Sequence, residues 1–339
     1  MSHRLLGGLS PREFLRRYWQ KRPLFVPRAL PGFAGVLDRR ALGALARRDD
    51  VESRIVERRG TRWDTRHGPF SEAKIRSRNA TLLVNGVNLH LPAAEALLRR
   101  FHFVPQARLD DVMVSYATPG GGVGPHVDSY DVFLLQGPGR RRWRVLGKNY
   151  TTSAGDLLYL PPGVEHDGVA LEPCYTYSIG FRAPRGAELG AAFLDWLHER
   201  GLPEARYRDP GLAPARRPAR IPAGMVQFTA QVLSRIRWSR SDVVDFLGRY
   251  LSAPKPHVVF RPGAGRGRRV RLDSKTQLLY FGGRFFINGE SLVVRHPERL
   301  RELADRREAD LERLAPLAAL ISQWRRAGYL HFTNKEGDG

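Results

Sequence analysis

The stretch from Val112 to Phe181 constrains the fold more than any other part of this sequence, because it consists of short apolar runs broken by glycine and proline. The runs are Met113–Ala117, Val132–Gln136, Trp143–Leu146, Asp156–Leu160 and Tyr175–Phe181. Many short strands without intervening helices are typical of an antiparallel barrel or jelly roll. We therefore expect a β-barrel at the centre of the chain.

Helical patterns flank this region on both sides. Ser10-Pro11-Arg12-Glu13 combines a capping serine, a proline suited to the first turn and a glutamate that can reach back to the cap. Further helices are predicted after Asp38 and over 92–103, 187–200, 224–237 and 241–252. A linker rich in proline and arginine, Asp209 to Pro222, separates two of them. Apolar stripes at helical spacing, such as those after Pro184, indicate either core or a surface for a partner helix.

Beyond Pro256 the pattern predicts a strand, a basic loop, two strands, two helices and a final strand. This order suggests a small winged-helix domain. We see no internal repeat, and no apolar run approaches the length of a membrane span. The N-terminus lacks the long apolar stretch of a secretory signal, and the single cysteine, Cys174, fits a reducing cytosol.

The 339 residues carry a formal net charge of +22, which raises the possibility of a nucleic-acid partner. The charge is unevenly distributed. Residues 110–172 contain eight acids and five bases, so that this segment is net −3 and the rest of the chain carries +25. An acidic patch is therefore expected around the barrel.

Two histidines and an aspartate are the strongest candidates for a metal site. His126 and Asp128 follow a glycine-rich turn and precede an apolar strand, where positions i and i+2 share a face. His166 follows the turn Pro161-Pro162-Gly163, which suits a ligand that approaches from across the barrel. Two imidazoles and one carboxylate leave half of an octahedral coordination sphere open, as non-haem Fe(II) oxygenases require. The same ligands also suit Mn(II) or Zn(II), and zinc would indicate hydrolytic chemistry.

An anion-binding group near the metal would distinguish these cases, and the run Gly139-Arg140-Arg141-Arg142-Trp143 offers one. If this run lies antiparallel to Val132–Gln136, strand alternation turns alternate arginines inward. An inward guanidinium can hold a carboxylate with two hydrogen bonds. The pattern alone leaves open which arginine does so.

The sequence closely resembles the bacterial ribosomal oxygenases of the cupin-4 branch of the JmjC family, which are protein hydroxylases dependent on Fe(II) and 2-oxoglutarate. The stretches that carry the resemblance are residues 125–137, 139–145, 155–163 with His166, 177–184 and 9–24. The resemblance implies a mixed α+β fold. Its expected parts are a JmjC domain with a double-stranded β-helix core at 1–185, a helical dimerisation domain at 186–255 and a winged-helix domain at 256–339.

The resemblance also implies roles for individual residues. His126, Asp128 and His166 match the iron ligands, and Arg141 matches the basic residue that binds the far carboxylate of 2-oxoglutarate. Ser178 is a second contact to that co-substrate. With dioxygen, such enzymes hydroxylate the β-carbon of an arginine in a large-subunit ribosomal protein. The implied protein is a cytoplasmic homodimer that works near the ribosome or its RNA.

One part of the chain departs from the family pattern. The stretch from Trp143 to Gly155 is shorter, either because an insertion has been lost or because a flexible loop is missing from the sequence. The iron ligands survive both cases, whereas substrate recognition at that edge is placed in doubt.

A basic substrate should be repelled by a chain of charge +22, so we expect local acids to receive it. Asp131, Glu165 and Asp167 are the candidates for contact with the substrate arginine. Two other functions remain open. One is a different outcome at the same iron, such as histidyl hydroxylation or demethylation. The other is nucleic-acid binding through the basic patch at 261–271.

Overall fold

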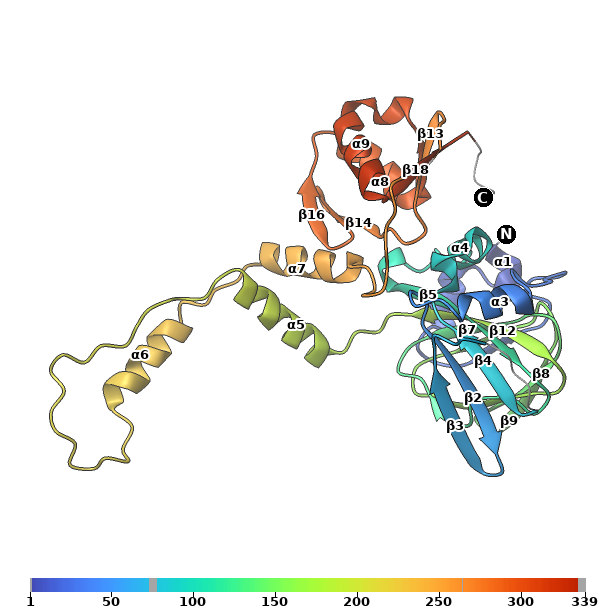
Figure 1. Ribbon diagram of the computed structural model, residues 1–339, viewed down its shortest axis with the longest axis horizontal. Coiled ribbons are helices and arrows are strands. Elements are labelled where there is room, and N and C mark those ends of the chain that lie inside the picture. The colour runs from blue at the N-terminus through green and yellow to red at the C-terminus, as the bar shows by residue number, and fades with distance from the viewer. Residues whose placement is uncertain (1, 73–77, 264, 335–339) are drawn as a thin grey trace.

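The computed structural model describes residues 2–72, 78–263 and 265–334. Figure 1 shows a β-rich body at the N-terminal end, an extended helical arm and a second compact body at the C-terminal end. Among the described residues, no helix has both the length and the apolar character needed to cross a membrane.

The β-rich body contains two antiparallel sheets, which confirms the predicted barrel. The larger sheet has the order β1-β10-β7-β12-β5-β4-β2-β3. Its strands are β1 (Leu24–Val26), β10 (Leu157–Leu160), β7 (Val132–Gln136), β12 (Cys174–Phe181), β5 (Leu109–Ala117), β4 (Ala80–Val84), β2 (Ser53–Arg59) and β3 (Arg62–His67). The smaller sheet, of order β6-β11-β8-β9, comprises β6 (His126–Val127), β11 (Glu165–Ala170), β8 (Arg141–Val145) and β9 (Lys148–Thr152).

This topology corrects one expectation. The arginine-bearing strand β8 does not pair with β7, because β7 lies between β10 and β12 in the larger sheet. Its neighbours are β11 and β9 in the smaller sheet. Alternation along β8 still turns every second side chain inward.

The central strands are apolar on both faces because each face meets a different core. Phe133 and Leu135 of β7 face the core that the N-terminal helices share. Val132 and Leu134 face Trp143 and the smaller sheet. A strand buried on both sides reads as a continuous apolar run, which is the pattern seen at 132–135.

Short helices cover the outer face of the larger sheet. They are α1 (Ser2–Leu5), α2 (Pro11–Arg17), α3 (Arg39–Leu45) and α4 (Pro92–Arg99), with 3-10 turns at Val87–Leu89 and Gln106–Arg108. The predicted capping box of α2 is present, because Ser10 Oγ accepts from the Glu13 amide at 3.2 Å and Glu13 accepts from the Ser10 amide at 2.8 Å. Asp38 caps α3 through a single bond, in which its Oδ1 accepts from the Ala41 amide at 2.8 Å.

After β12 the chain leaves the barrel as the helical arm, which we define as residues 186–252. It contains α5 (Gly186–Glu199), α6 (Ala223–Leu233) and α7 (Arg240–Ser252), with an extended excursion between α5 and α6. Neither α5 nor α6 has a buried residue.

The C-terminal body has its own core, which includes Phe285, Leu300 and Trp324. Its elements are β13 (Arg269–Leu272), β14 (Leu278–Phe281), β15 (Arg284–Ile287), β16 (Glu290–Val293), α8 (Pro297–Arg306), β17 (Glu308–Asp310), a 3-10 helix (Glu312–Leu317), α9 (Ala318–Ala327) and β18 (Leu330–Thr333). The structure thus has more strands than the pattern predicted. The winged-helix assignment stays a prediction.

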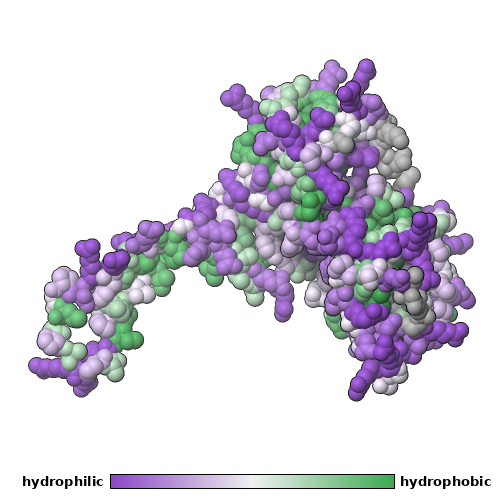
Figure 2. Space-filling view, viewed as in Figure 1, coloured by the Kyte–Doolittle hydropathy of each residue, from purple (hydrophilic) through white to green (hydrophobic). Residues whose placement is uncertain are grey.

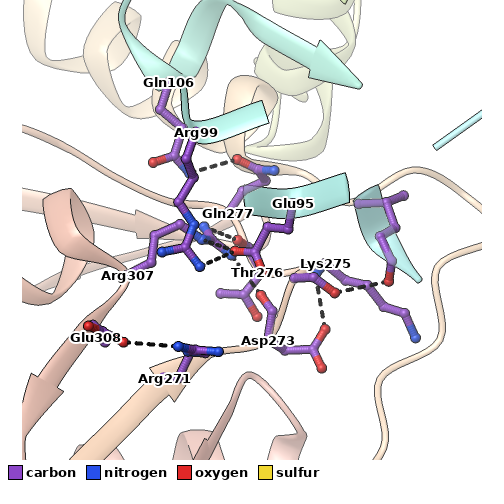
Figure 3. Close-up of polar contacts among 12 residues, drawn as sticks. Glu95, Arg99, Gln106, Arg271, Asp273, Lys275, Thr276, Gln277, Arg307 and Glu308 are labelled. Atoms are coloured by element: carbon purple, nitrogen blue, oxygen red, sulfur yellow. Dashed lines mark hydrogen bonds and ion pairs between the residues drawn. The ribbon is translucent and has the colours of Figure 1, made fainter. Parts of the chain in front are cut away.

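Buried polar contacts join the C-terminal body to the barrel (Figure 3). Arg307 Nε donates to Glu95 of α4 at 2.8 Å, and its other nitrogens donate to the carbonyls of Thr276 and Asp273 at 2.9 and 2.7 Å. Gln106 Nε2 also donates to Gln277 at 3.2 Å. Glu95 and Arg307 are both buried, so this joint is shielded from water.

Candidate metal and co-substrate site

The three predicted metal ligands converge at one end of the barrel. His126 of β6 lies directly opposite His166 of β11, and their ring centroids are 4.2 Å apart. Asp128 follows β6, with Oδ1 4.0 Å from His126 Nε2 and Oδ2 3.7 Å from His166 Nε2. The ligand atoms of all three residues lie within 4.8 Å of one another. One ion can therefore contact all three.

Hydrogen bonds to backbone carbonyls orient both imidazoles toward this point. His126 Nδ1 lies 2.9 Å from the Gly124 carbonyl, and His166 Nδ1 lies 3.0 Å from the Val164 carbonyl. A carbonyl oxygen can only accept, so each Nδ1 carries the proton and each Nε2 keeps its lone pair. Partners of this kind hold metal-binding histidines in the required tautomer.

Burial lowers the pKa of His166, and the hydrogen bond to Val164 opposes this effect. The imidazole is therefore neutral over a wider pH range than an exposed histidine, as a metal ligand must be. Burial, followed by the charge of Asp128, raises the pKa of the nearby Tyr130 to about 12. The Tyr130 phenol thus stays protonated at neutral pH.

The donor set fits a divalent transition metal with open coordination positions. Two imidazole nitrogens and one carboxylate form the facial triad of Fe(II) oxygenases. Within the described part of the chain, no further His, Cys, Asp or Glu joins this cluster. The protein therefore leaves coordination positions for other ligands.

Arg141 supplies the anion-binding group next to the metal ligands. Its side chain is buried and lines the same cavity of about 540 Å³ as the three ligands, 5.5 Å from the ring of Trp143. Its Nε and Nη2 are buried, and no residue that the structure describes forms a hydrogen bond with them. An unpaired buried guanidinium is costly, so these donors indicate that an anion belongs here.

The neighbouring arginines do not compete for this role. Arg140 and Arg142 are exposed, and Arg140 forms an ion pair with Glu172 at 3.1 Å. Strand alternation in β8 therefore selects Arg141 from the three.

Two hydroxyl side chains of β12 face the same cavity. Ser178, the predicted second co-substrate contact, is buried and lines it. Thr176, two residues earlier on the same face, also lines it, and its buried Oγ1 forms no hydrogen bond within the described part of the chain. The sequence analysis did not single out Thr176, although Thr176 and Ser178 are two residues apart on one strand and therefore share a face.

None of the three acids predicted to meet the substrate lines this cavity. Asp131 is fully buried, where it accepts from Tyr159 Oη at 2.6 Å and from Gln20 Nε2 at 3.0 Å. Glu165 and Asp167 alternate with His166 along β11, so they point away from the face that His166 presents to the metal site.

Other acids line the cavity instead. Glu52, Asp110 and Asp111 line the cavity together with Asp128. Burial raises the pKa of Asp111, and Lys255, whose Nζ lies 3.4 Å from Asp111 Oδ2, opposes that rise. The adjacent pair Asp110-Asp111 at the start of β5 is visible in the sequence, but nothing there shows that it faces the metal.

The stretch that is shorter than the family pattern forms a closed hairpin. Val145 of β8 pairs with Lys148 of β9 across the two-residue turn Leu146-Gly147. Both turn residues have positive φ, 48° and 76°, as a type I′ turn requires. The strands are thus joined without further residues.

Comparisons with known proteins agree with this geometry. The model of the JmjC domain family matches residues 96–154 and 148–189. The chain is 34% identical to the ribosomal protein uL16 3-hydroxylase of Escherichia coli, over 94% of this chain and 97% of that protein. It is 35% identical to a probable ribosomal oxygenase of Haemophilus influenzae, over 53% of this chain and 52% of the relative.

Solved structures are similar over nearly the whole chain. The Escherichia coli ribosomal oxygenase YcfD in complex with cobalt and 2-oxoglutarate matches with a TM-score of 0.79 and 32% identity, over 95% of this chain and 98% of that one. The same protein with cobalt and succinic acid matches with a TM-score of 0.79 and 33% identity, over 95% and 98%.

Proposed function

This chain belongs to the JmjC-domain family of ribosomal oxygenases, and from that premise we propose that it hydroxylates a ribosomal protein with Fe(II), 2-oxoglutarate and dioxygen. One observation carries the proposal. A three-ligand metal site with open positions shares its cavity with a buried guanidinium that lacks an anionic partner.

Each side chain of the site has a distinct task. His126, Asp128 and His166 hold the metal, and Arg141 pairs with the far carboxylate of 2-oxoglutarate, assisted by the hydroxyls of Thr176 and Ser178. When bound, the iron and 2-oxoglutarate supply the activation of dioxygen for insertion of one oxygen into a C–H bond. The buried walls of the cavity exclude water and position the carbon to be oxidised.

We further propose that the target is an arginine of a large-subunit ribosomal protein, hydroxylated at its β-carbon. The relative from Escherichia coli acts on the ribosomal protein uL16 as a 3-hydroxylase. Asp110 and Asp111 line the cavity and offer two carboxylates to a guanidinium, a pairing of high specificity. A ribosomal substrate also implies that the enzyme works in the cytoplasm.

Histidyl hydroxylation and lysine demethylation are the alternative outcomes at the same iron. A relative from Dictyostelium discoideum with both activities in its name is 37% identical, but over 19% of this chain and 18% of its own length. The carboxylates in the cavity favour a cationic side chain over a neutral imidazole.

Turnover on peptides of ribosomal proteins, followed by mass spectrometry, tests the proposed reaction. Hydroxylation adds one oxygen to a peptide, whereas demethylation removes a methyl group and releases formaldehyde. We expect one added oxygen on an arginine, dependent on Fe(II) and 2-oxoglutarate and abolished by Asp128→Ala. Release of formaldehyde would indicate demethylation, and an oxygen on a histidine would indicate histidyl hydroxylation. Either result would overturn the assignment of arginine as the hydroxylated residue.

We also propose that the helical arm joins two copies of the chain. Its exposed apolar residues include Leu194, Val226, Leu233 and Trp238, and Figure 2 shows apolar side chains along the arm where it extends from the body. Helices α5 and α6 have no buried residue, and a second identical arm offers a matching apolar face.

Light scattering during gel filtration tests this arrangement. The wild type should have the mass of a dimer, and Val226→Asp with Leu233→Asp should give monomers that keep their far-ultraviolet circular dichroism. Gln227→Asp, at an exposed polar position of the same helix, should remain dimeric. A monomeric wild type would refute the proposal.

Nucleic-acid binding through the patch at 261–271 is less well supported. Within the patch, Arg269 and Arg271 form ion pairs with Glu308, at 3.3 Å each. These arginines are engaged within their own domain, so fewer charges remain for phosphates. Steeply salt-dependent binding to duplex RNA or DNA would nevertheless favour that function.

A further inference from the structure

Lys255 reaches into the acidic end of the metal cavity from a different part of the chain. It follows α7, between Pro254 and Pro256, and its Nζ lies 3.4 Å from Asp110 Oδ1 and 3.4 Å from Asp111 Oδ2. The two prolines restrict the backbone on both sides, so the flexible part of this contact is the lysine side chain.

The same lysine borders a second hollow. A groove between the barrel edge and the helical arm is lined by Phe181, Glu188 and Tyr250, and it shares Asp110, Tyr130 and Lys255 with the metal cavity. Lys255 therefore stands where the cavity meets the groove.

The electrostatics show that this ammonium neutralises the cavity acids. Burial lowers the pKa of Lys255, but Asp111 and Asp110 outweigh burial and the net shift is upward. Asp110 has a second cation nearby, because its Oδ1 lies 3.6 Å from Arg182 Nε. Among the described residues, the cation that pairs with Asp111 is Lys255. Asp111 Oδ2 also accepts a hydrogen bond from the Gly86 amide at 2.8 Å, so Lys255 supplies its charge partner but not its sole contact.

We propose that Lys255 is a built-in competitor of the substrate: its ammonium occupies Asp110 and Asp111 in the free enzyme and withdraws toward the groove when a substrate guanidinium enters. This inference rests on the proposed arginine substrate. A buried carboxylate is costly when unpaired, so a resident cation stabilises the empty cavity.

The chemistry of the two cations explains why a substrate arginine can displace Lys255 from the two acids. The lysine contacts are long, at 3.4 Å, and an ammonium is a compact point charge. A guanidinium offers five donors in a planar fork and can bind a carboxylate with two parallel hydrogen bonds. A neutral or small side chain lacks the charge to displace Lys255, so the lysine acts as a filter for arginine.

Two substitutions with opposite expected effects test the competition. Lys255→Met removes the competing charge and should strengthen binding of an arginine peptide about fivefold, as expected for a partly exposed ion pair. Lys255→Arg installs a stronger competitor and should weaken it. The probe is a uL16 peptide with a single arginine, titrated by calorimetry into protein loaded with Mn(II) and 2-oxoglutarate.

Two controls separate charge competition from structural damage. The same peptide with citrulline in place of arginine has nearly the same shape without the charge, so Lys255→Met should raise its affinity by clearly less than that of the arginine peptide. Lys21→Met removes one positive charge from the exposed surface and should leave both affinities unchanged.

The outcomes also distinguish this inference from the proposed function. If the wild type binds the arginine peptide more tightly than the citrulline peptide but Lys255→Met leaves that affinity unchanged or weaker, the competition is refuted and the arginine substrate stands. If the wild type does not distinguish the two peptides, the arginine substrate fails, and the role of Lys255 fails with it.

Discussion

Arg141 shows how one side chain determines what a metal site can do. Two histidines and an aspartate suit several metals, but a buried guanidinium without a partner requires an anion in the same cavity. The histidines are equally constrained, because backbone carbonyls hold the proton on each Nδ1. The contacts of single side chains thus select both the tautomer of the two histidines and the anionic co-substrate.

Substitution of Arg141 tests this selection. Arg141→Met removes two unsatisfied donors, and charge-assisted hydrogen bonds of this kind contribute about 1.5–3 kcal/mol, so the KM for 2-oxoglutarate should rise by about tenfold or more. The measurement is 2-oxoglutarate turnover at varied concentration. Arg142→Met, one residue away on the exposed face, is the matched control and should leave this KM unchanged. Equal effects of the two variants would contradict the assignment.

At the scale of elements, alternation within strands decides which residues share a site. In β8 it brings Arg141 and Trp143 inward, and in β11 it directs Glu165 and Asp167 away from His166. The hairpin that joins β8 to β9 turns within two residues, and Leu146 takes a left-handed conformation there. That conformation disfavours a leucine and favours Asn before Gly.

We therefore expect Leu146→Asn to stabilise the protein. The side chain of Leu146 is exposed, so its removal forfeits little burial, while asparagine adopts the required φ at lower cost. The free energy of unfolding should increase by up to about 1 kcal/mol, as measured by urea denaturation. Leu146→Ala trims the same side chain without this backbone preference and should not stabilise. A lower stability of Leu146→Asn would mean that the leucine makes contacts absent from this structure.

At the scale of the whole molecule, buried polar contacts hold the C-terminal body against α4 (Figure 3). Arg307 anchors the joint through Glu95 and two carbonyls. His102 lies beside it in a small cavity lined by Glu95, Arg99 and Arg307. A partly buried imidazole therefore borders the ion pair of the joint.

Loss of the Arg307 guanidinium should weaken the joint. Arg307→Met leaves Glu95 buried, and Arg99, 3.4 Å away, compensates in part. The cost should be about 3 kcal/mol, near the lower end for a broken buried pair. Urea denaturation and limited proteolysis of the C-terminal body measure it. Arg306→Met is the control, because its ion pair with Glu302 is exposed and contributes little.

Acidification should loosen the same joint. Burial, followed by the charges of Arg307 and Arg99, lowers the pKa of His102 from 6.5 to about 4. Between these values the unfolded chain binds a proton that the folded protein does not, so the free energy of unfolding falls as the pH drops from about 6.5 to about 4. His90, with a pKa also lowered to about 4, adds to this slope.

The pH dependence of His102→Gln checks the assignment. This variant should show a shallower loss of stability between pH 6.5 and 4 than the wild type. His67→Gln, at an exposed position, should keep the wild-type slope. An unchanged slope in His102→Gln would assign the acid sensitivity elsewhere.

Local rules of the chain were enough to predict the barrel, the flanking helices and the metal ligands. Strand breaks at glycine and proline, helix caps and i, i+2 alternation act over a few residues, so they can be read directly. The family resemblance added Arg141 and Ser178. The metal ligands, Arg141 and Ser178 could therefore be assigned from short stretches of the sequence.

Tertiary structure alone decided which acids line the metal cavity. Asp131 lies three residues from a metal ligand, yet its side chain is buried against Tyr159, which is 28 positions away. Lys255 lies more than a hundred positions from Asp111, yet the two are in contact. The number of charged residues along a sequence does not show which way their side chains point. The net charge of a cavity depends on which side chains the sheets and the linker turn toward it.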